Sequence, residues 1–204
     1  MADFRANGPW DVSEVDVDDG IERLDLIALR VAAMPGIDVQ VQVDEASGNV
    51  VQLTFARPDG GVQVQPYAAP RSGGLWDEVR PQIKASISSG GGLVEESEGP
   101  FGVELRAQVM AEGSGALQPA RFVGIEGPRW FLRAVFLGSA ARPGDAADAL
   151  EAMVRGLVVV RGTEAMPVGS AIPLRMPEHP DAAATAAPSP PSPFARGPEI
   201  TETR

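Results

Sequence analysis

The sequence contains no cysteine, which excludes disulfides, thiolate metal sites and cysteine nucleophiles. Its single histidine, His179, leaves no basis for a histidine-containing catalytic triad or a multi-histidine metal site. No run approaches the roughly 20 consecutive apolar residues of a membrane span. Residues 1–14 contain neither the basic nor the apolar region of a secretory signal. We therefore expect a cytoplasmic protein without a membrane segment, a metal site or a cofactor.

Positive charge is scarce at the start of the chain. The net charge is −11. Residues 1–49 contain 11 acidic and 3 basic side chains, whereas residues 50–162 contain 12 and 11. This balance disfavours nucleic-acid binding driven by counterion release. The acidic run DVDDG at 16–20 does not complete an EF-hand calcium loop, because the twelfth position is occupied by Ile27 and not by glutamate.

The clearest pattern that is present is a β-hairpin over residues 121–138. Its second half alternates, and one face carries the apolar side chains Trp130, Leu132, Ala134 and Phe136. The break at Glu126-Gly127-Pro128 predicts a two-residue turn at Glu126-Gly127, which places Val123 opposite Trp130 and Arg121 opposite Leu132. We expect this hairpin at the centre of an antiparallel sheet, with Trp130 buried and with Arg129 and Arg133 on the other face.

Alternation also predicts a three-stranded meander. Its strands are expected at 37–43, 50–56 and 62–67, joined by turns at Ser47-Gly48-Asn49 and Asp59-Gly60-Gly61. Further strands are expected around 26–31, at 93–96 and at 102–110. Residues 157–160 fit either a buried strand or a helix tail.

Two stretches have helical periodicity. In the first, the apolar residues recur at helical spacing and comprise Trp76, Val79, Ile83 and Ile87. Pro81 interrupts it, so the helix either kinks there or begins its main body there. The second runs from 145 to 156 with Asp145 as a possible N-cap, and its apolar stripe includes Leu150 and Met153. Both stripes are expected to be buried against the sheet.

Together these elements predict one α+β domain over residues 21–177. It contains an antiparallel sheet of six or more strands, formed by the meander and the central hairpin and packed by two helices. Residues 1–20 are expected to be an acidic, partly disordered lead-in that Phe4 and Trp10 could attach to the domain. Residues 178–204 are rich in proline, alanine and serine, and we expect a disordered tail that is dispensable for folding.

Candidate ligand-binding residues are Arg121, Arg129, Arg133, Arg71 and Tyr67. Three arginines on the hairpin beside aromatic residues could bind an anion or a nucleotide. The alternative is that these arginines form ion pairs across strands with Glu104, Glu95 or Glu126. No set of residues forms a catalytic constellation. Adjacent carboxylates such as Glu95/Glu96 and Asp77/Glu78 point in different directions and are expected to be solvated.

Five stretches together carry a family resemblance: ERLDLIALRV before Pro35-Gly36, AAPRSGGLWDEVR, GPFGVELRA, RFVGIEGPRWFLR and VVVRG. With them, residues 8–177 resemble an uncharacterised actinobacterial protein family with a label of unknown function, family 3710. Ala32, where that family often has proline, is a minor departure. The resemblance implies a lineage and a compartment but no activity.

The order of elements also resembles Mog1/PsbP-type and secretion-chaperone-type α+β sandwiches, folds that mostly bind other proteins. The leading functional hypothesis is a non-enzymatic protein-interaction or assembly module whose partner is another protein, with the acidic N-terminus and the proline-rich tail as flexible contact segments. The alternatives are a small-ligand or nucleotide-binding domain that uses Arg121, Arg129 and Arg133, and an enzyme with carboxylate chemistry. A deep pocket with convergent carboxylates and arginines would favour the alternatives, and a filled sheet with a shallow apolar patch the first.

Overall fold

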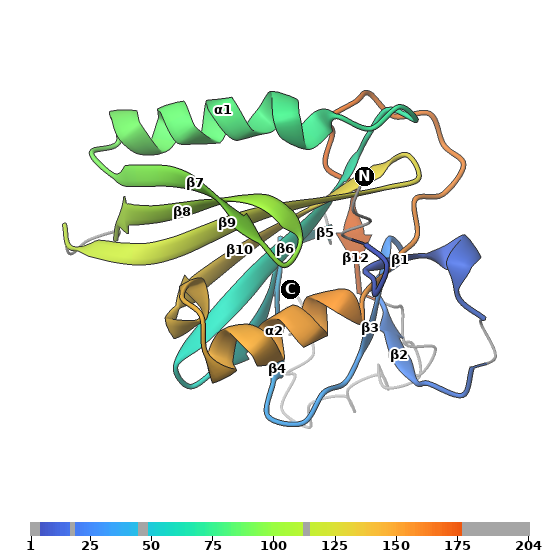
Figure 1. Ribbon diagram of the computed structural model, residues 1–204. Coiled ribbons are helices and arrows are strands. Elements are labelled where there is room, and N and C mark those ends of the chain that lie inside the picture. The colour runs from blue at the N-terminus through green and yellow to red at the C-terminus, as the bar shows by residue number, and fades with distance from the viewer. Residues whose placement is uncertain (1–4, 17–18, 45–48, 112–114, 177–204) are drawn as a thin grey trace, which may run out of the picture.

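The computed structural model in Figure 1 describes residues 5–16, 19–44, 49–111 and 115–176. The main sheet has eight antiparallel strands. They are β4 (Asp38–Val43), β5 (Asn49–Arg57), β6 (Gly60–Ala68), β7 (Leu93–Gly99), β8 (Gly102–Met110), β9 (Leu117–Gly127), β10 (Trp130–Gly138) and β12 (Leu174–Arg175). The order is β12-β5-β6-β10-β9-β8-β7, with β4 also paired to β5. The predicted meander is confirmed as β4, β5 and β6.

The other elements lie on the two faces of this sheet. They are the helices α1 (Leu75–Ser89) and α2 (Asp145–Arg155), the short 3-10 turns η1 (Val12–Glu14) and η2 (Ser139–Ala141), and a second sheet of β1 (Trp10–Asp11), β2 (Arg23–Asp25), β3 (Leu29–Ala32) and β11 (Val158–Val159). In Figure 1 α1 lies above the main sheet, with α2 and the second sheet below it. The predicted α+β class, with six or more strands and two helices, is confirmed. The second sheet, in which β1 runs parallel to β11, was not predicted.

The central hairpin is confirmed, but its predicted register is wrong. Trp130 pairs with Gly127, and Arg121 lies opposite Phe136 and not opposite Leu132. The turn is therefore Pro128-Arg129. Proline fixes φ at the first turn position, and Arg129 has a φ of 62° at the second, which is the pattern of a type II turn. Glycine is required at 127 because a Cβ there would lie 2.1 Å from the Trp130 ring.

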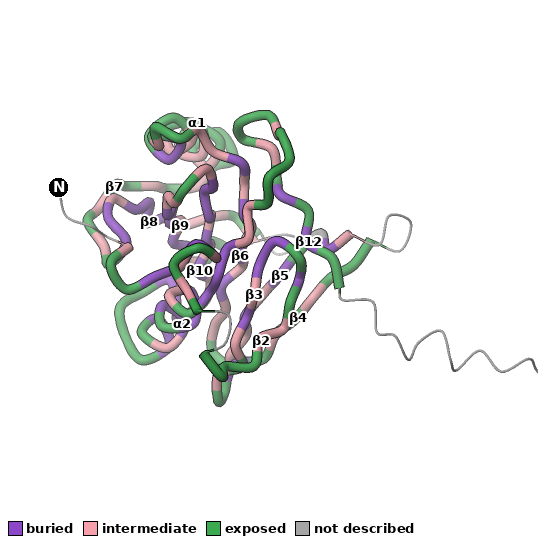
Figure 2. The backbone as a smooth tube through the Cα atoms, turned by 90° about the vertical axis from the view of Figure 1, so that its right-hand side faces the viewer, coloured by how far each residue is buried: buried purple, intermediate pink, exposed green. Residues whose placement is uncertain are grey.

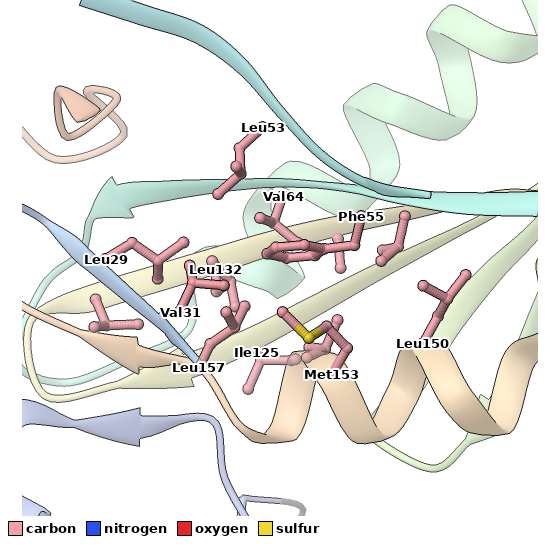
Figure 3. Packing of buried hydrophobic residues seen from close by; sticks show 14 of the residues in the cluster. Leu29, Val31, Leu53, Phe55, Val64, Ile125, Leu132, Leu150, Met153 and Leu157 are labelled. Carbon is pink, nitrogen blue, oxygen red and sulfur yellow. The ribbon is translucent and has the colours of Figure 1, made fainter. Parts of the chain in front are cut away.

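The larger core lies between the main sheet and the layer of α2 and the second sheet. Trp130, Leu132, Ala134 and Phe136 are all fully buried in it, as their alternation predicted. Figure 3 shows Leu150 and Met153 of α2 pointing toward Phe55, Ile125 and their neighbours on the sheet. The helix therefore contributes its apolar stripe to the core, as predicted.

The smaller core lies under α1. It contains Leu75, Trp76, Leu105 and Phe131. The Trp76 indole packs on Gly124, where an added Cβ would lie 2.3 Å from the ring. Val79 and Ile83 are only half-buried, and most of α1 is exposed in Figure 2, so the predicted burial of this helix holds for its first turn alone. The helix continues through Pro81.

The N-cap of α2 is Gly144, so the predicted cap Asp145 is the first helical residue, where its negative charge favours the helix N-terminus. The undecided stretch 157–160 contains strand β11.

The strand predicted around 26–31 is confirmed in part: residues 29–31 belong to β3, whereas residues 26–28 form a tight turn between β2 and β3. Leu26 and Ala28 are buried, whereas Ile27 is 57% exposed and has a φ of 71°. The Asp25 carboxylate accepts the Ile27 N–H at 2.7 Å, and the Leu26 N–H donates to the Leu29 carbonyl. A β-branched residue in the left-handed region is strained, and alternation alone gives no sign of it.

Relief of this strain is testable. Replacing Ile27 by asparagine, which tolerates the left-handed region, should raise the free energy of unfolding by about 1 kcal/mol. Little apolar burial is lost because the side chain is mostly exposed. Urea denaturation measures the change, and Ile21→Asn is the control, since Ile21 is 53% exposed without positive φ. Equal effects of the two substitutions would contradict the strain at Ile27.

The N-terminal segment was expected to be partly disordered, but residues 5–16 lie against the domain. β1 pairs with β11, and the Trp130 Nε1–H donates to the buried Asp11 carboxylate at 2.8 Å. Arg5 forms an ion pair with Glu14, and this hydrogen bond lowers the pKa of Glu14. The domain therefore begins before residue 21, because the lead-in contributes a strand and a buried polar contact. The predicted tail at 178–204 and the turn at 47–49 lie wholly or largely outside the described residues.

Candidate functional site

The three hairpin arginines predicted to cluster lie in three different places. Arg121 shares its face of the sheet with Phe136 and α2. Arg133 pairs with Gly124 and Gln65 on the opposite face, which carries α1. Arg129 occupies the hairpin turn and donates to the Gly162 carbonyl at 2.7 Å. The structure therefore does not bring them together as one anion patch.

Arg121 is part of a buried ionic cluster. It is 5% exposed and lies 2.7 Å from a Glu151 oxygen and 3.5 Å from Glu104, which is 1% exposed. Arg106 also contacts Glu104, at 3.1 Å. The Arg121 guanidinium lies 4.2 Å from the centre of the Phe136 ring. Ion pairing with Glu104, the alternative considered from the sequence, is therefore confirmed for this arginine.

Glu151 was missed as a partner, although the sequence contained a signal. It lies four residues after Ala147 and three before Val154, on the apolar side of the helical repeat. Glu126, expected to pair with an arginine, instead caps α1: its carboxylate accepts the N–H groups of Gly74 and Trp76, each at 2.8 Å. This carboxylate satisfies amides that a helix N-terminus leaves unpaired.

Arg133 and Tyr67 remain close together. The Arg133 guanidinium lies 5.3 Å from the centre of the Tyr67 ring. Arg71 is exposed in the loop before α1. Ligand binding by these residues stays a prediction. Among the described residues no group of three or more His, Cys, Asp or Glu side chains could hold a metal, and no helix is long and apolar enough to cross a membrane.

Strand β7 ends the main sheet with one unpaired edge. It pairs with β8 alone, and no other described strand lies beside it. Gly99 and Gly102 flank the two-residue turn Pro100-Phe101, and such a flanking pair exchanges hydrogen bonds. Counting back along the strand, Ser97 and Glu95 bond to β8. The N–H and C=O groups of Val94, Glu96 and Glu98 therefore point away from the sheet.

A groove of about 450 Å³ lies beside this free edge. It is formed by β7, β8 and β9 with the chain after η2, and its lining includes Leu93, Glu95, Arg106, Gln108, Pro119 and Arg142. Three large apolar side chains lie on the same face at one end of these strands: Leu93 (66% exposed), Met110 (46%) and Leu117 (48%). The edge and the groove share residues 93–95, so they form one continuous surface, the edge groove.

The charge of the edge groove is partly uncompensated. Glu96 interacts with Arg80 at 3.5 Å and with Lys84 at 3.4 Å, both from α1. Glu95 and Glu98 make no ion pair with any residue in the described part of the chain. The edge groove therefore offers backbone hydrogen-bonding groups, apolar side chains and free carboxylates. Sequence reasoning missed it because pairing order in a sheet depends on long-range contacts.

A second cavity, also of about 450 Å³, lies near the β2–β3 turn. Its lining includes Ile27, Met166, Ile172, Arg161, Glu164 and Arg175. Both of these arginines are engaged: Arg161 donates to the carbonyls of Arg129 and Glu164, and Arg175 to the Asn49 side chain. This cavity is therefore lined by apolar side chains together with arginines that are held by neutral acceptors.

These features define a three-layer α+β sandwich with an open edge strand beside a groove. The chain belongs to the family described as "Protein of unknown function (DUF3710)", whose model matches residues 8–183. No curated protein matches the sequence.

Two solved structures are similar in part. One is a crystal structure from Bacteroides thetaiotaomicron VPI-5482, with 15% identity and a TM-score of 0.38. The match covers 70% of this chain, and this chain spans about half (49%) of the Bacteroides chain. The other is the solution structure of cyanobacterial PsbP (CyanoP) from Synechocystis sp. PCC 6803, with 11% identity and a TM-score of 0.39, covering 68% of this chain and 92% of that one. With TM-scores below 0.5, no property of either protein is transferred to this chain.

Proposed function

We propose that this protein is a non-enzymatic protein-interaction module that binds an extended, basic segment of another protein at the edge groove. The observation that carries the proposal is the unpaired edge of β7, which borders a groove of about 450 Å³. An exposed strand edge binds an extended peptide through main-chain hydrogen bonds, and neighbouring pockets select its alternate side chains.

The side chains around the edge set the chemistry of the partner. On the groove face the partner strand meets the apolar Leu93 and the carboxylate of Glu95. On the α1 face it meets Glu98, and neither Glu95 nor Glu98 has a cation partner among the described residues. Because side chains alternate along a strand, each face of the partner meets one free carboxylate, so the matching partner combines basic with apolar residues.

Pairing of β7 with a second copy of this chain is disfavoured by the same charges. Each copy would then bring Glu95, Glu96 and Glu98 into the new strand pair, so the carboxylates of both copies would lie close together. Like charges opposite each other destabilise a strand pair, and charged edge strands commonly prevent self-association. The acidic edge therefore favours a basic partner over a homodimer.

The other functional hypotheses have less support. The carboxylate pairs considered for an enzyme do not converge: Glu95 and Glu96 lie on opposite faces of β7, and Asp77 and Glu78 are exposed on α1. A small-ligand function rests on Arg133 with Tyr67 and not on Arg121 or Arg129. A cytoplasmic location and an actinobacterial origin remain proposals based on the sequence.

The test uses an acetylated, amidated peptide of alternating lysine and valine, about eight residues long to match a strand. Isothermal titration should give a Kd on the order of 100 µM or tighter, and a glutamate–valine peptide should not bind. Glu98→Pro removes an N–H that points away from the sheet, so binding should weaken at least tenfold while the fold is retained. Glu98→Gln keeps the N–H and separates the effect of the charge.

The matched control is Ser97→Pro. The Ser97 N–H belongs to the β7–β8 ladder, so this substitution should lower the melting temperature, unlike Glu98→Pro. Undiminished binding by Glu98→Pro, or equal binding of the acidic peptide, would overturn the proposal. Sedimentation showing a dimer that Glu98→Pro dissociates would instead assign the edge to a second copy.

A further inference from the structure

The face of the main sheet that carries α1 is only half covered. The helix packs on β7, β8 and β9, which leaves this face of β4, β5 and β6 without a covering element among the described residues. In Figure 1 the helix runs along one side of the sheet, consistent with this partial cover. The uncovered part is polar and carries Gln40, Gln42, Gln52, Thr54, Gln63 and Gln65. Arg133 of β10 lies at its border, opposite Gln65.

Arg133 is a half-buried cation without a counter-ion. It takes part in no ion pair or side-chain hydrogen bond with any described residue, and its guanidinium lies over the Tyr67 ring at 5.3 Å. Contact with the aromatic ring restricts the guanidinium and leaves its N–H groups available. The chain has a net charge of −11, so carboxylates are plentiful, yet Arg133 pairs with none of those in the described residues. Its positive charge is therefore available to a ligand.

A small hollow of about 110 Å³ lies beside this guanidinium. It is lined by Gln52, Gln63, Val64, Gln65, Arg133 and Val135, with no carboxylate among them. Two of the amides are held in place: Gln65 Nε2 donates to the carbonyls of Pro66 and Ile172, and Gln52 Nε2 donates to Thr54 Oγ1, all at 3.2 Å. The Gln63 side chain makes no hydrogen bond with a described residue, so its amide N–H groups are free to donate.

We propose that this hollow binds a small oxyanion, a carboxylate or phosphate group, through Arg133 and Gln63. The planar guanidinium fork matches two oxygens of such a group, and charge-assisted hydrogen bonds of this kind are among the strongest available. A volume of about 110 Å³, roughly that of four water molecules, is sufficient for a carboxylate or phosphate group. This site lies on the α1 face over β5, β6 and β10, apart from the edge groove of β7. Its test is therefore independent of the test of the proposed function.

The test is an NMR titration of the ¹⁵N-labelled protein with sodium phosphate and, separately, sodium acetate, against sodium chloride at matched ionic strength. The Arg133 Nε–H signal and the Gln63 side-chain amide should shift saturably, with a Kd in the low millimolar range. Saturation by phosphate alone assigns a phosphate group, and saturation by acetate alone assigns a carboxylate. A shift that does not saturate, or an equal shift with chloride, would overturn the site.

Three variants complete the test. Arg133→Gln should weaken binding at least tenfold, and Arg133→Lys should weaken it less because it keeps the charge but loses the fork. Arg30→Gln is the matched control, since Arg30 lies in β3 of the second sheet, outside the hollow, and its titration should equal that of the unaltered protein. The spectra report whether each variant is folded. Unchanged binding by Arg133→Gln, or loss in Arg30→Gln, would contradict the assignment.

Discussion

Replacing Arg121 by methionine is expected to lower the free energy of unfolding by about 3–5 kcal/mol. The reason is the pair of carboxylates left behind. Glu151 lies 2.7 Å from Arg121 and has no other cation among its described contacts, while Glu104 keeps Arg106 at 3.1 Å. A buried charge without a partner costs far more than the ion pair contributed, since attraction within the pair largely offsets its desolvation. Urea denaturation at neutral pH measures the change.

The control is a second substitution in the same cluster. Arg121→Met combined with Glu151→Leu removes the orphaned carboxylate, so the double variant should be more stable than Arg121→Met by about 2 kcal/mol. Leucine also suits the position, because Glu151 lies between the buried residues Leu150 and Met153 on the side of α2 that faces the sheet. Strictly additive losses would show that the cost comes from packing of the Arg121 stem on Phe136 and not from charge.

The fold class could be predicted from the sequence because it depends on local alternation. The meander follows from apolar residues at every second position, which bury one face of each strand whatever its neighbours are. The hairpin register could not be obtained in this way. Glu126-Gly127 and Pro128-Arg129 both offer a plausible two-residue turn. The choice is made by packing of the Trp130 ring over Gly127 and by Arg129 accepting a positive φ.

The second sheet was missed because its strands are too short to show a period. β1, β2, β3 and β11 contain two to four residues each, and they come from distant parts of the chain. What fixes β1 is a tertiary contact, the hydrogen bond from Trp130 to the Asp11 carboxylate, across 119 positions. The acidic composition of residues 1–20 predicted a solvated segment. Composition alone does not show that one of these carboxylates, that of Asp11, accepts a hydrogen bond from the buried Trp130 indole.

For the candidate sites, too, the local pattern predicted which face a side chain lies on but not which strands lie side by side. Alternation correctly separates the face of Arg133 from that of Trp130, and it also indicates that Arg121 and Arg133 belong to different strands whose relative face depends on register. The predicted register is off by four residues, an even number, so Arg121 lies on the face of Trp130 and opposite to that of Arg133 in the predicted and in the observed register alike. The edge groove depends on β7 being last in the sheet, a property of strand order that no local pattern encodes.

Replacing Trp130 by alanine is expected to lower the free energy of unfolding by about 3–5 kcal/mol, the range for large-to-small changes of a buried aromatic residue. The indole is fully buried in the larger core, and its N–H donates to Asp11 at 2.8 Å. The alanine variant therefore leaves a cavity beside Gly127 and also releases the segment that carries β1. Loss of hydrogen-exchange protection at residues 10–11 should accompany the loss of stability, since β1 is a two-residue strand.

Two further variants separate the contributions of Trp130. Trp130→Phe keeps an aromatic ring but removes the donor to Asp11, which still accepts the Ser13 N–H at 3.0 Å, so its cost should be smaller than that of Trp130→Ala. Arg133→Ala, on the same strand but the opposite face, should cost about 1 kcal/mol or less, because Arg133 is in no ion pair with a described residue. Chemical denaturation of the three variants gives the ranking. If Arg133→Ala proved more costly than Trp130→Ala, the sheet face assigned to the core would be the wrong one.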